Sequence, residues 1–593
     1  MEMRLFSVTF RTVFWRFFLF KDCAASMFSA LQSKAQQIVQ SLYGLDGVHI
    51  SWERPQQTVF GDIATPVALQ VAKRIKKHPN AIAGEIAERL SKEPSVDRAE
   101  AAGPGYVNVW LKPEVLIEEL MRTREACTAR DTRTEEHPVI VEYSQPNVAK
   151  PLGIHHILST VIGQTLVNFY RHAGYPVIAW NYMGDWGTQF GKLAVAFKRW
   201  GEGKKVSECS IEELLALYVR FHDEAEQDPL LEEEARKTFV MLERGDEGVR
   251  AFWRDVVGVT KASLGHLYDR LHVKFDLDIS ESFYEDKMAP ILEEGTKKNI
   301  FTKGEKGALI VEFSEESKLP PALVQKADEG TLYATRDLAN LRYRIDTYRP
   351  ERILYVVDVA QMLYFQQLFA IANLLQWKLP ELQHVVVGRM RFADKKMSTR
   401  KGNILRLEEV LDEAVKRAGD LIKSRGDSIQ SDDPQDLAEM MGVGAVVYGI
   451  LSQNRQSELV FDWDRMLSYE GNSAPYLQYT HARARSVLRK ADAGESIAFP
   501  QCIAALTEAE RALVGTLQQF PHSLQEALSG HLPHHLTHYL YELCQSFNAF
   551  YNSEPILQAA EPQKTLRLAL TALTATVLKC GAELLTLRVP DRM

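Results

Sequence analysis

Short apolar strands alternate with helices through the middle of the chain, and this order constrains the fold more than any other feature. The segments with the apolar, β-branched character of buried strands lie at 138–144, 176–184, 351–358 and 382–388. Helical spacing of apolar residues marks segments between them, such as 157–174 and 362–376. Strands that alternate with helices build βαβ units, so the sequence predicts an α/β domain with a parallel sheet.

Regions of different character flank this α/β domain. Residues 27–136 mix helical patterns with one alternating strand at 106–111, and we expect a small α+β domain there. Helical patterns dominate 416–593, which indicates an all-α bundle. The α/β domain would then span 137–415. A charged helical stretch at about 194–273 is expected to be an insertion in it, with solvated faces.

The first 26 residues form an aromatic-rich run that does not fit a standard targeting segment. Arg11 and Arg16 interrupt it, so its uncharged stretches are too short for a signal peptide or a membrane span. An organelle transit peptide would suit the arginines but not the two acidic residues in the run. We interpret 1–26 as a leader or a misassigned start, because an amphipathic helix begins at Met27. No other segment resembles a membrane span.

Composition excludes several classes of protein. The 593 residues are 46% hydrophobic and 25% charged, which is not the composition of a disordered or collagen-like chain. The formal net charge of -8 argues against a globally basic nucleic-acid binder but leaves room for local basic surfaces. The six cysteines show no CxxC spacing, so we expect neither a metal site nor a disulfide framework. Such cysteine usage is typical of a reducing, cytoplasmic compartment.

The loop after the first strand of the predicted sheet is the first candidate site. It precedes a helix, and free backbone N–H groups at a helix start attract phosphate. Lys150 adds positive charge, Gly153 permits close approach of a ligand, and His155 and His156 offer imidazole nitrogens. Two adjacent histidines are as readily core residues, so the residues alone leave the two interpretations equally open.

A basic segment after the last strand is the second candidate. Lys396, Arg400 and Lys401 surround small residues, and such a loop can close over a triphosphate and neutralise departing pyrophosphate. By itself it would be a solvated surface loop. Both segments follow strands of one parallel sheet, however, so they are expected at the same sheet edge, which favours a shared phosphate site.

Longer strings resemble a known family. GIHH (153–156) stands where class I aminoacyl-tRNA synthetases carry their HIGH motif, and KMSTR (396–400) stands where they carry KMSKS. The strings that narrow the resemblance to arginyl-tRNA synthetases lie at 141–151, 181–191, 332–340, 396–403, 470–483 and 589–593. The resemblance covers nearly everything from Met27 onward. It implies a Rossmann-type catalytic domain between an N-terminal tRNA-contacting domain and an α-helical anticodon-binding domain.

The resemblance also implies a reaction and its substrates. L-arginine would attack the α-phosphate of ATP, bound with Mg2+, to form arginyl-adenylate. The arginyl group would then pass to the 3'-terminal adenosine of tRNA(Arg). The family suggests that activation requires bound tRNA, that the protein is a monomer and that it is cytoplasmic.

Site residues follow from matching the motifs position by position. The residues implied in catalysis are Lys150, His155, His156, Lys396, Arg400 and Lys401. Those implied in ATP binding are Pro151, Leu152, Gly153, Ile154, His155, His156, Met397 and Ser398. Those implied in arginine binding are Glu142, Asn147, Glu281, Tyr333, Asp337 and Gln361. Those implied in tRNA binding are Tyr476, Tyr479, Arg483, Asn548 and Tyr551.

Without the family, several of these residues have simpler interpretations. Asp337 would pair with its neighbour Arg336, and Tyr333 would be a core aromatic. The helix that carries His481 and Arg483 would present a solvated basic face. Other class I synthetases, for cysteine, glutamate or lysine, are rival enzymes, and a tRNA-binding paralogue without catalysis is a rival of another kind.

The chain departs from the family in both motifs. The first histidine of His-x-Gly-His is Gly153 here, and the glycine is His155. We hypothesise that the two positions have exchanged duties, so that Gly153 supplies room for adenine and His155 supplies the donor. In the second motif Thr399 replaces the second lysine, and Lys150 is expected to substitute for it.

Overall fold

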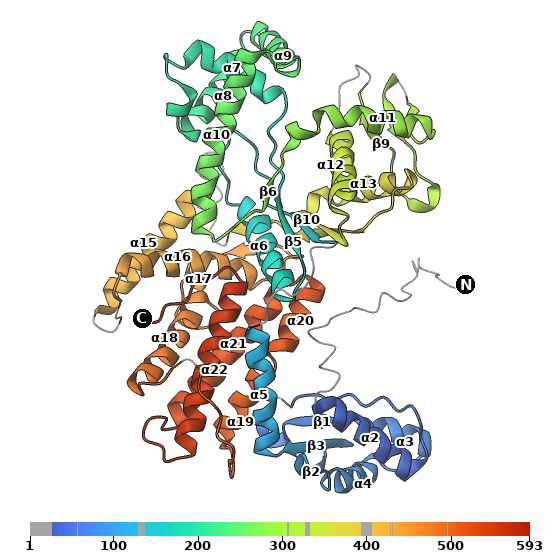
Figure 1. Ribbon diagram of the computed structural model, residues 1–593, viewed down its shortest axis with the longest axis vertical. Coiled ribbons are helices and arrows are strands. Elements are labelled where there is room, and N and C mark those ends of the chain that lie inside the picture. The colour runs from blue at the N-terminus through green and yellow to red at the C-terminus, as the bar shows by residue number, and fades with distance from the viewer. Residues whose placement is uncertain are drawn as a thin grey trace. The chain divides into compact units, whose positions relative to one another are not determined.

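The computed structural model describes 27–55, 57–128, 137–304, 307–326, 333–392, 406–426, 429, 431–494 and 496–593. The expected leader and the basic segment lie outside these residues. The chain divides into two compact units (Figure 1). The first contains Met1–Thr128, Val487–Pro521 and Gln545–Val577, and the second contains Ala129–Ser486, His522–Cys544 and Leu578–Met593.

The first unit combines a small antiparallel sheet with helices. Its sheet has the order β1 (Ile63–Thr65), β3 (Tyr106–Leu111), β2 (Val96–Ala102). Its helices include α2 (Met27–Tyr43), α3 (Val67–Ile75), α4 (Pro79–Leu90), α5 (Pro113–Cys127) and α19 (Glu508–Leu517). The predicted strand at 106–111 is confirmed. Strands β1 and β2 were not predicted, and β2 escapes a period-two search because most of its side chains are charged or alanine.

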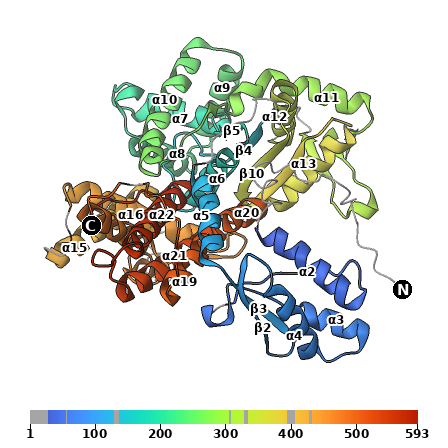
Figure 2. The same ribbon diagram turned by 60° about the horizontal axis from the view of Figure 1, so that its bottom comes forward.

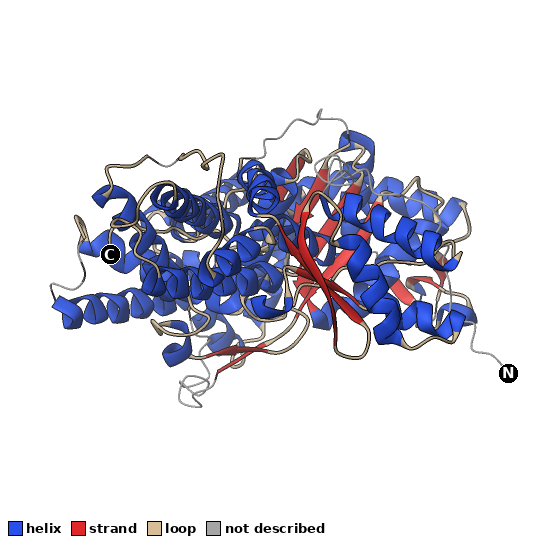
Figure 3. Ribbon diagram, turned by 90° about the horizontal axis from the view of Figure 1, so that it is seen from below, coloured by secondary structure: helices blue, strands red, loops and turns tan. Residues whose placement is uncertain are grey.

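Five parallel strands form the main sheet of the second unit. Their order is β11 (Glu381–Val387), β10 (Arg352–Asp358), β4 (Val139–Glu142), β5 (Val177–Asn181), β6 (Leu277–Asp278). Figure 3 shows the strands as a twisted sheet, as chirality requires. Strand β10 is buried along nearly its whole length, which explains its continuous apolar sequence. The predicted α/β class with a parallel sheet is confirmed.

Helices connect these strands. Helix α6 (His156–His172) joins β4 to β5, and α13 (Met362–Leu374) joins β10 to β11. The helices between β5 and β6 are α7 (Thr188–Trp200), α8 (Ile211–Ala225), α9 (Leu230–Glu243) and α10 (Glu247–Arg270). Figure 2 shows these four helices grouped together. Their core contains Trp186, Phe190 and Leu214, so the charged residues of this stretch occupy the outer faces.

The segment between β6 and β10 contains helices and a second small sheet. Its helices are η4 (Glu281–Lys287), α11 (Met288–Lys297) and α12 (Tyr333–Tyr348). The sheet has the antiparallel order β7 (Thr302–Lys303), β8 (Leu309–Val311), β9 (Ala322–Gln325). Helix α12 packs on the main sheet through residues such as Leu338 and Leu341, which share a core with Ile353 of β10.

The chain after β11 is mostly helical, with one pair of strands. Strands β12 (Met390–Phe392) and β13 (Leu459–Phe461) pair in parallel, so the expected all-α bundle over 416–593 contains one short strand, β13. The helices are α15 (Leu407–Arg425), α16 (Pro434–Leu451), α17 (Trp463–Met466), α18 (Ala474–Lys490), α20 (Phe520–Gly530), α21 (His534–Ser553) and α22 (Gln563–Leu584). None of the described helices is long and apolar enough to cross a membrane.

Arg455 connects three backbone segments of the second unit. Its guanidinium donates to the carbonyl oxygens of His531 and Val386, each over 2.6 Å, and to that of Gly530 over 3.3 Å. The side chain is buried, and burial lowers its pKa to about 10. One cation with neutral partners therefore holds together the end of β11, the turn before β13 and the turn after α20.

Candidate active site

The loop at the carboxyl end of β4 has an unusual backbone. Ser144, Gln145 and Ala149 have φ values of 72°, 52° and 61°, which residues other than glycine adopt rarely. The loop bonds to the segment after β5, because the N–H of Val148 donates to the carbonyl of Gly184 over 3.1 Å. A Cβ atom at Gly184 would lie 2.5 Å from Oδ1 of Asn147, so a larger residue would require the Asn147 side chain to move. Asn147 is exposed beside this contact.

The GIHH motif leads into α6, whose first residue is His156. The N–H of Gly153 donates to Nδ1 of His156 over 3.1 Å, which fixes that imidazole against the loop. Burial lowers the pKa of His156 to about 4, so this ring is neutral at physiological pH. The ring of His155 lies 4.0 Å from it, centroid to centroid, and is exposed. The two histidines therefore differ: one is packed within the loop and one faces outward.

The segment that follows the basic loop returns to the GIHH loop. The N–H of Leu407 donates to the carbonyl of Leu152 over 2.9 Å, and Arg406 forms a bridge with Gly153. Lys150 is exposed, with its ammonium 5.5 Å from the ring centroid of Tyr218. Pro151, Leu152 and Ile154 complete this loop. The predicted residues Lys396, Met397, Ser398, Arg400 and Lys401 lie outside the described residues.

Asp337, on α12, is held by two tyrosine hydroxyls. Tyr182 donates to its Oδ1 over 3.0 Å, and Tyr364 on α13 donates to its Oδ2. Burial raises the pKa of Asp337 to about 6. The simpler interpretation, an ion pair between Asp337 and Arg336, is wrong. Arg336 lies 3.1 Å from Glu281 instead, and burial raises the pKa of Glu281 to about 7 despite this cation.

Glu142 ends β4 and is almost wholly buried. Its Oε2 lies 2.5 Å from Nη2 of Arg344, and its Oε1 accepts from Gln145 over 2.5 Å. The Arg344 guanidinium lies 4.2 Å from the ring centroid of Trp180 on β5. The carboxylate expected to hold the amino-acid end of arginine is thus already paired with an internal cation.

The other two predicted arginine-binding residues stand at helix starts. Tyr333 is the first residue of α12 and is 64% exposed, so its interpretation as a core aromatic is wrong. Gln361 immediately precedes α13 and is exposed as well. Both helices start on the carboxyl side of the parallel sheet, where ligands of such folds bind.

Sequence reasoning missed several residues of this region. Tyr182 and Asp185 lie inside the string 181–191, so the motif could have drawn attention to them. Asp185 is buried and accepts from both the N–H and the hydroxyl of Ser282, which fixes the chain next to Glu281. Tyr364 and Arg344 carry no comparable signal, because their partners are distant in sequence.

The predicted tRNA-binding residues are distributed over two helices. On α18 the Arg483 guanidinium lies 4.6 Å from the ring centroid of Tyr479, and Tyr476 lies 5.7 Å from Tyr541 of α21. Asn548 and Tyr551 belong to the part of α21 in the first unit. The assignment of His481 to the basic face is wrong, since it is buried and its Nδ1 lies 2.9 Å from the carbonyl oxygen of Pro590.

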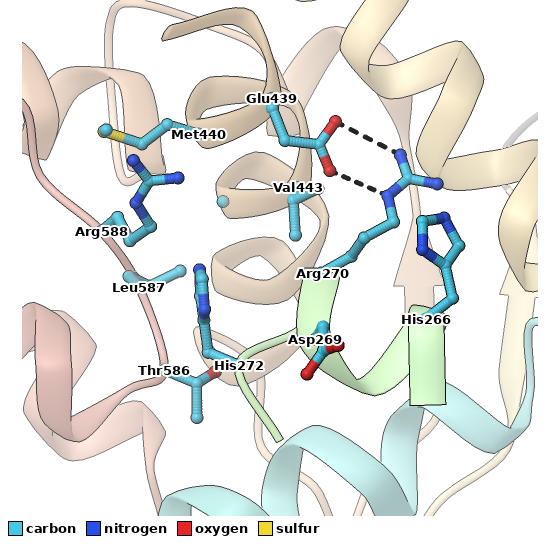
Figure 4. Close-up of a pocket in the computed structure, with 11 residues that line it drawn as sticks. His266, Asp269, Arg270, His272, Glu439, Met440, Val443, Thr586, Leu587 and Arg588 are labelled. Atoms are coloured by element: carbon cyan, nitrogen blue, oxygen red, sulfur yellow. Dashed lines mark hydrogen bonds and ion pairs between the residues drawn. The ribbon is translucent and has the colours of Figure 1, made fainter. Parts of the chain in front are cut away.

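A separate cavity of about 260 Å³ contains none of the predicted site residues (Figure 4). It lies where the end of α10, α16 and residues 586–588 meet. Arg270 donates to Glu439 within it, and Arg588 pairs with Asp436 nearby. Its arginines are therefore engaged by carboxylates. Among the described residues no group of three or more His, Cys, Asp or Glu could hold a metal ion.

The family models cover most of the chain. The model described as tRNA synthetases class I (R), catalytic domain, matches 118–463. The Arginyl tRNA synthetase N terminal domain matches 29–111, and the DALR anticodon binding domain matches 477–593. The parallel sheet, with the GIHH loop at the carboxyl end of β4, is thus that of a class I aminoacyl-tRNA synthetase.

Similar proteins identify the amino acid that synthetases of this family attach to tRNA. The arginine–tRNA ligase of Fusobacterium nucleatum is 39% identical, and the alignment covers 90% of this chain and 94% of that protein. The arginine–tRNA ligase of Clostridioides difficile is 40% identical, with 91% and 95% covered. The chain belongs to the arginyl-tRNA synthetase family and is an arginine–tRNA ligase. The rival assignments to cysteine, glutamate or lysine are wrong.

Solved structures share the fold. Thermus thermophilus arginyl-tRNA synthetase aligns with a TM-score of 0.74 at 25% identity, covering 96% of this chain and 100% of that one. The Plasmodium falciparum arginyl-tRNA synthetase also gives 0.74, at 22% identity, covering 95% and 99%. The second likeness concerns the fold alone.

Proposed function

We propose that this chain activates L-arginine with Mg-ATP and transfers the arginyl group to the 3'-terminal adenosine of tRNA(Arg). The observation that carries this proposal is the position of Asp337. Its carboxylate, on α12, is oriented by two phenols, and one of these, Tyr182, directly follows β5. Strand β5 pairs with β4, and the loop after β4 carries GIHH. A guanidinium-sized cation and a nucleotide phosphate would be bound by neighbouring loops of one sheet.

The first step needs no nucleophilic side chain. The carboxylate oxygen of arginine would attack the α-phosphorus, and the bond from that phosphorus to the bridging oxygen of pyrophosphate would break. Positioning and charge neutralisation dominate such a displacement. We assign neutralisation to Lys150 and to Lys396, Arg400 and Lys401 of the basic loop. Pro151, Leu152, Gly153, Ile154, Met397 and Ser398 would surround the nucleotide.

The two histidines of the variant motif are proposed to have different roles. His155 is exposed at the start of α6, where it can donate to a phosphate or ribose oxygen. His156 is half-buried and fixed by Gly153, so it would hold the loop in shape and contact the nucleotide only through its free ring edge. Gly153 lacks a side chain and would leave room for adenine.

Arginine is proposed to bind in an extended pose between two groups of residues. Asp337, Glu281, Tyr333 and Gln361 would receive the guanidinium, and Glu142 with Asn147 would hold the amino-acid end. Lysine would leave carboxylate acceptors unpaired, at a cost of about 1–3 kcal/mol for each buried group.

The tRNA is proposed to bind along α18 and α21. Tyr476, Tyr479 and Arg483 of the second unit would contact anticodon bases, since splayed bases stack on aromatic rings and guanidinium planes. Asn548 and Tyr551 of the first unit are proposed as further tRNA contacts. We further propose that the protein works as a monomer in the cytoplasm.

ATP–pyrophosphate exchange tests the proposal. Exchange should depend on arginine, not on lysine, and it should be measured with and without tRNA(Arg). Aminoacylation of tRNA(Arg) should follow. A chain that binds tRNA(Arg) but supports neither exchange nor aminoacylation would instead be the non-catalytic paralogue.

A further inference from the structure

The Asp337 carboxylate is fixed by residues from three separate segments. Asp337 lies on α12, Tyr182 follows β5, and Tyr364 lies on α13. Each phenol donates to a different oxygen, Tyr182 to Oδ1 over 3.0 Å and Tyr364 to Oδ2. Because each donor holds a different oxygen, the carboxylate cannot rotate without breaking one of these bonds.

The charge pattern around Asp337 distinguishes it from its acidic neighbours. Glu142 lies 2.5 Å from the Arg344 guanidinium, and Glu281 lies 3.1 Å from that of Arg336. The oxygens of Asp337 accept from neutral hydroxyls, and no lysine or arginine in the described part of the chain forms an ion pair with them. Of Glu142, Glu281 and Asp337, only Asp337 therefore has no ion pair in the described part of the chain, and its charge remains available for an incoming cation.

We propose that Tyr182 and Tyr364 are positioning residues for the substrate guanidinium, and that they act by orienting the Asp337 carboxylate. A guanidinium presents paired donors in a rigid plane and binds best to two carboxylate oxygens held in that plane. Each carboxylate oxygen has two lone pairs, so each can accept from a phenol and from the substrate together. This inference rests on the proposed function.

The protonation of Asp337 supports the same role. The ionisable groups that face it are Glu142 on β4, Tyr182 after β5, Glu281 on η4, Arg336 on α12, Tyr355 on β10 and Tyr364 on α13. Burial raises its pKa to about 6, while the bonds from Tyr364 and Tyr182 oppose that rise. Removing either hydroxyl would move the pKa further upward, and a protonated Asp337 is a poor partner for a cation.

The test compares Tyr182→Phe and Tyr364→Phe with the wild-type chain. A matched control is Tyr43→Phe in the first unit, where Tyr43 also donates to a carboxylate, that of Glu85, over 2.6 Å. Aminoacylation of tRNA(Arg) is measured from pH 5.5 to 9, with arginine and ATP varied separately. Thermal unfolding reports whether each variant is folded.

Each site variant should raise KM for arginine by about tenfold or more, because a hydrogen bond to an ionised group is lost. KM for ATP should not change, and the acid limb of kcat/KM for arginine should move to higher pH. The Tyr43→Phe control should match wild type. An active wild type with unchanged arginine KM and acid limb in both site variants would overturn the inference.

A double-mutant cycle covers the case in which a phenylalanine variant is less stable. In an Asp337→Asn background, Tyr182→Phe and Tyr364→Phe should have little further effect on arginine KM. Full additivity would contradict the inference. If the wild-type chain lacks arginine-dependent activity, the proposed function fails by itself. Stabilisation of the folded chain by arginine then compares wild type with the variants, and equal stabilisation would again contradict the positioning role.

Discussion

Arg344 and Glu142 form an ion pair inside the second unit, with Nη2 of the arginine 2.5 Å from Oε2 of the glutamate. The arginine side chain is fully buried, and the glutamate is 3% exposed. Burial alone would lower the pKa of Arg344, but the attraction of neighbouring groups, chiefly Glu142, outweighs burial and raises that pKa above its ordinary value. Both charges therefore depend on each other, because neither has access to bulk water.

Replacing Arg344 should strongly destabilise the fold. Arg344→Met leaves the Glu142 charge buried without its cation, which should lower the free energy of unfolding by about 3–5 kcal/mol. Urea unfolding followed by circular dichroism measures this loss. The control is Arg254→Met, which breaks an exposed pair with Glu247 and should cost less than about 1 kcal/mol. Equal losses for the two variants would show that burial does not govern the pair.

Lys150 should contribute more to activation than Lys401. Lys150 lies on the GIHH loop with its ammonium exposed, and we expect it to replace the missing second lysine of the basic motif. Lys150→Ala should lower the rate of arginine-dependent pyrophosphate exchange on the order of 100-fold, as loss of a donor to developing negative charge does. Lys401→Ala should lose less. The reverse ranking in exchange assays at saturating ATP would contradict this assignment.

His155 should be the donor of the variant motif. His155→Ala should slow adenylate formation on the order of 100-fold, whereas His155→Gln, which keeps a donor, should retain part of the rate. Single-turnover formation of arginyl-adenylate separates this effect from tRNA steps. Wild-type rates in His155→Ala would contradict the hypothesis that His155 supplies the donor while Gly153 leaves room for adenine.

Stability should fall as the pH falls from about 6.5 to about 4. Burial lowers the pKa of His156 and His481 to about 4 and that of His531 to about 3. The unfolded chain then takes up protons that the folded chain excludes, so the stabilisation is complete above the ordinary histidine pKa and decreases below it. Urea unfolding at a series of pH values measures the slope.

One variant isolates a single histidine in that slope. His531→Asn should remove on the order of 3 kcal/mol of the decrease between pH 6.5 and 4, because asparagine does not titrate. Asparagine also tolerates the φ of 53° at this position. His522→Asn, at an exposed position, is the control for the substitution itself. An unchanged slope in His531→Asn would mean that this ring is not kept neutral by burial.

The sequence predicted the parallel sheet well because its strands are apolar, and β4 and β10 are buried along nearly their whole length. Strands β4, β5, β10 and β11 and helices α6 and α13 lie where continuous apolar runs and helical spacing indicated them. Strand β2 could not be found this way, since its sequence VDRAEAA leaves most side chains solvent-facing or partly exposed. Strand β13 is only three residues long and lies within a helical region.

Much of the candidate site depends on packing that local sequence does not encode. The motifs located Asp337 and Glu281, yet the neighbour of Asp337 in sequence, Arg336, bonds to Glu281 instead. Tyr364 reaches Asp337 because α12 and α13 lie side by side on the sheet. Glu142 and Arg344 are about two hundred positions apart, so only the completed fold pairs them. The partner of each of these side chains is therefore set by the packing of helices on strands.

The three hydrogen bonds of the Arg455 guanidinium have a consequence for hybrid enzymes built from two relatives. Its guanidinium donates to backbone carbonyls only, so it recognises the path of the chain at Val386, Gly530 and His531, not their side chains. A graft of the carboxyl-terminal helices onto another catalytic sheet would therefore inherit a mismatch in geometry even where every contacting side chain is identical. Crossover points that take all three segments and Arg455 from one parent should give folded hybrids, and points that separate them should not.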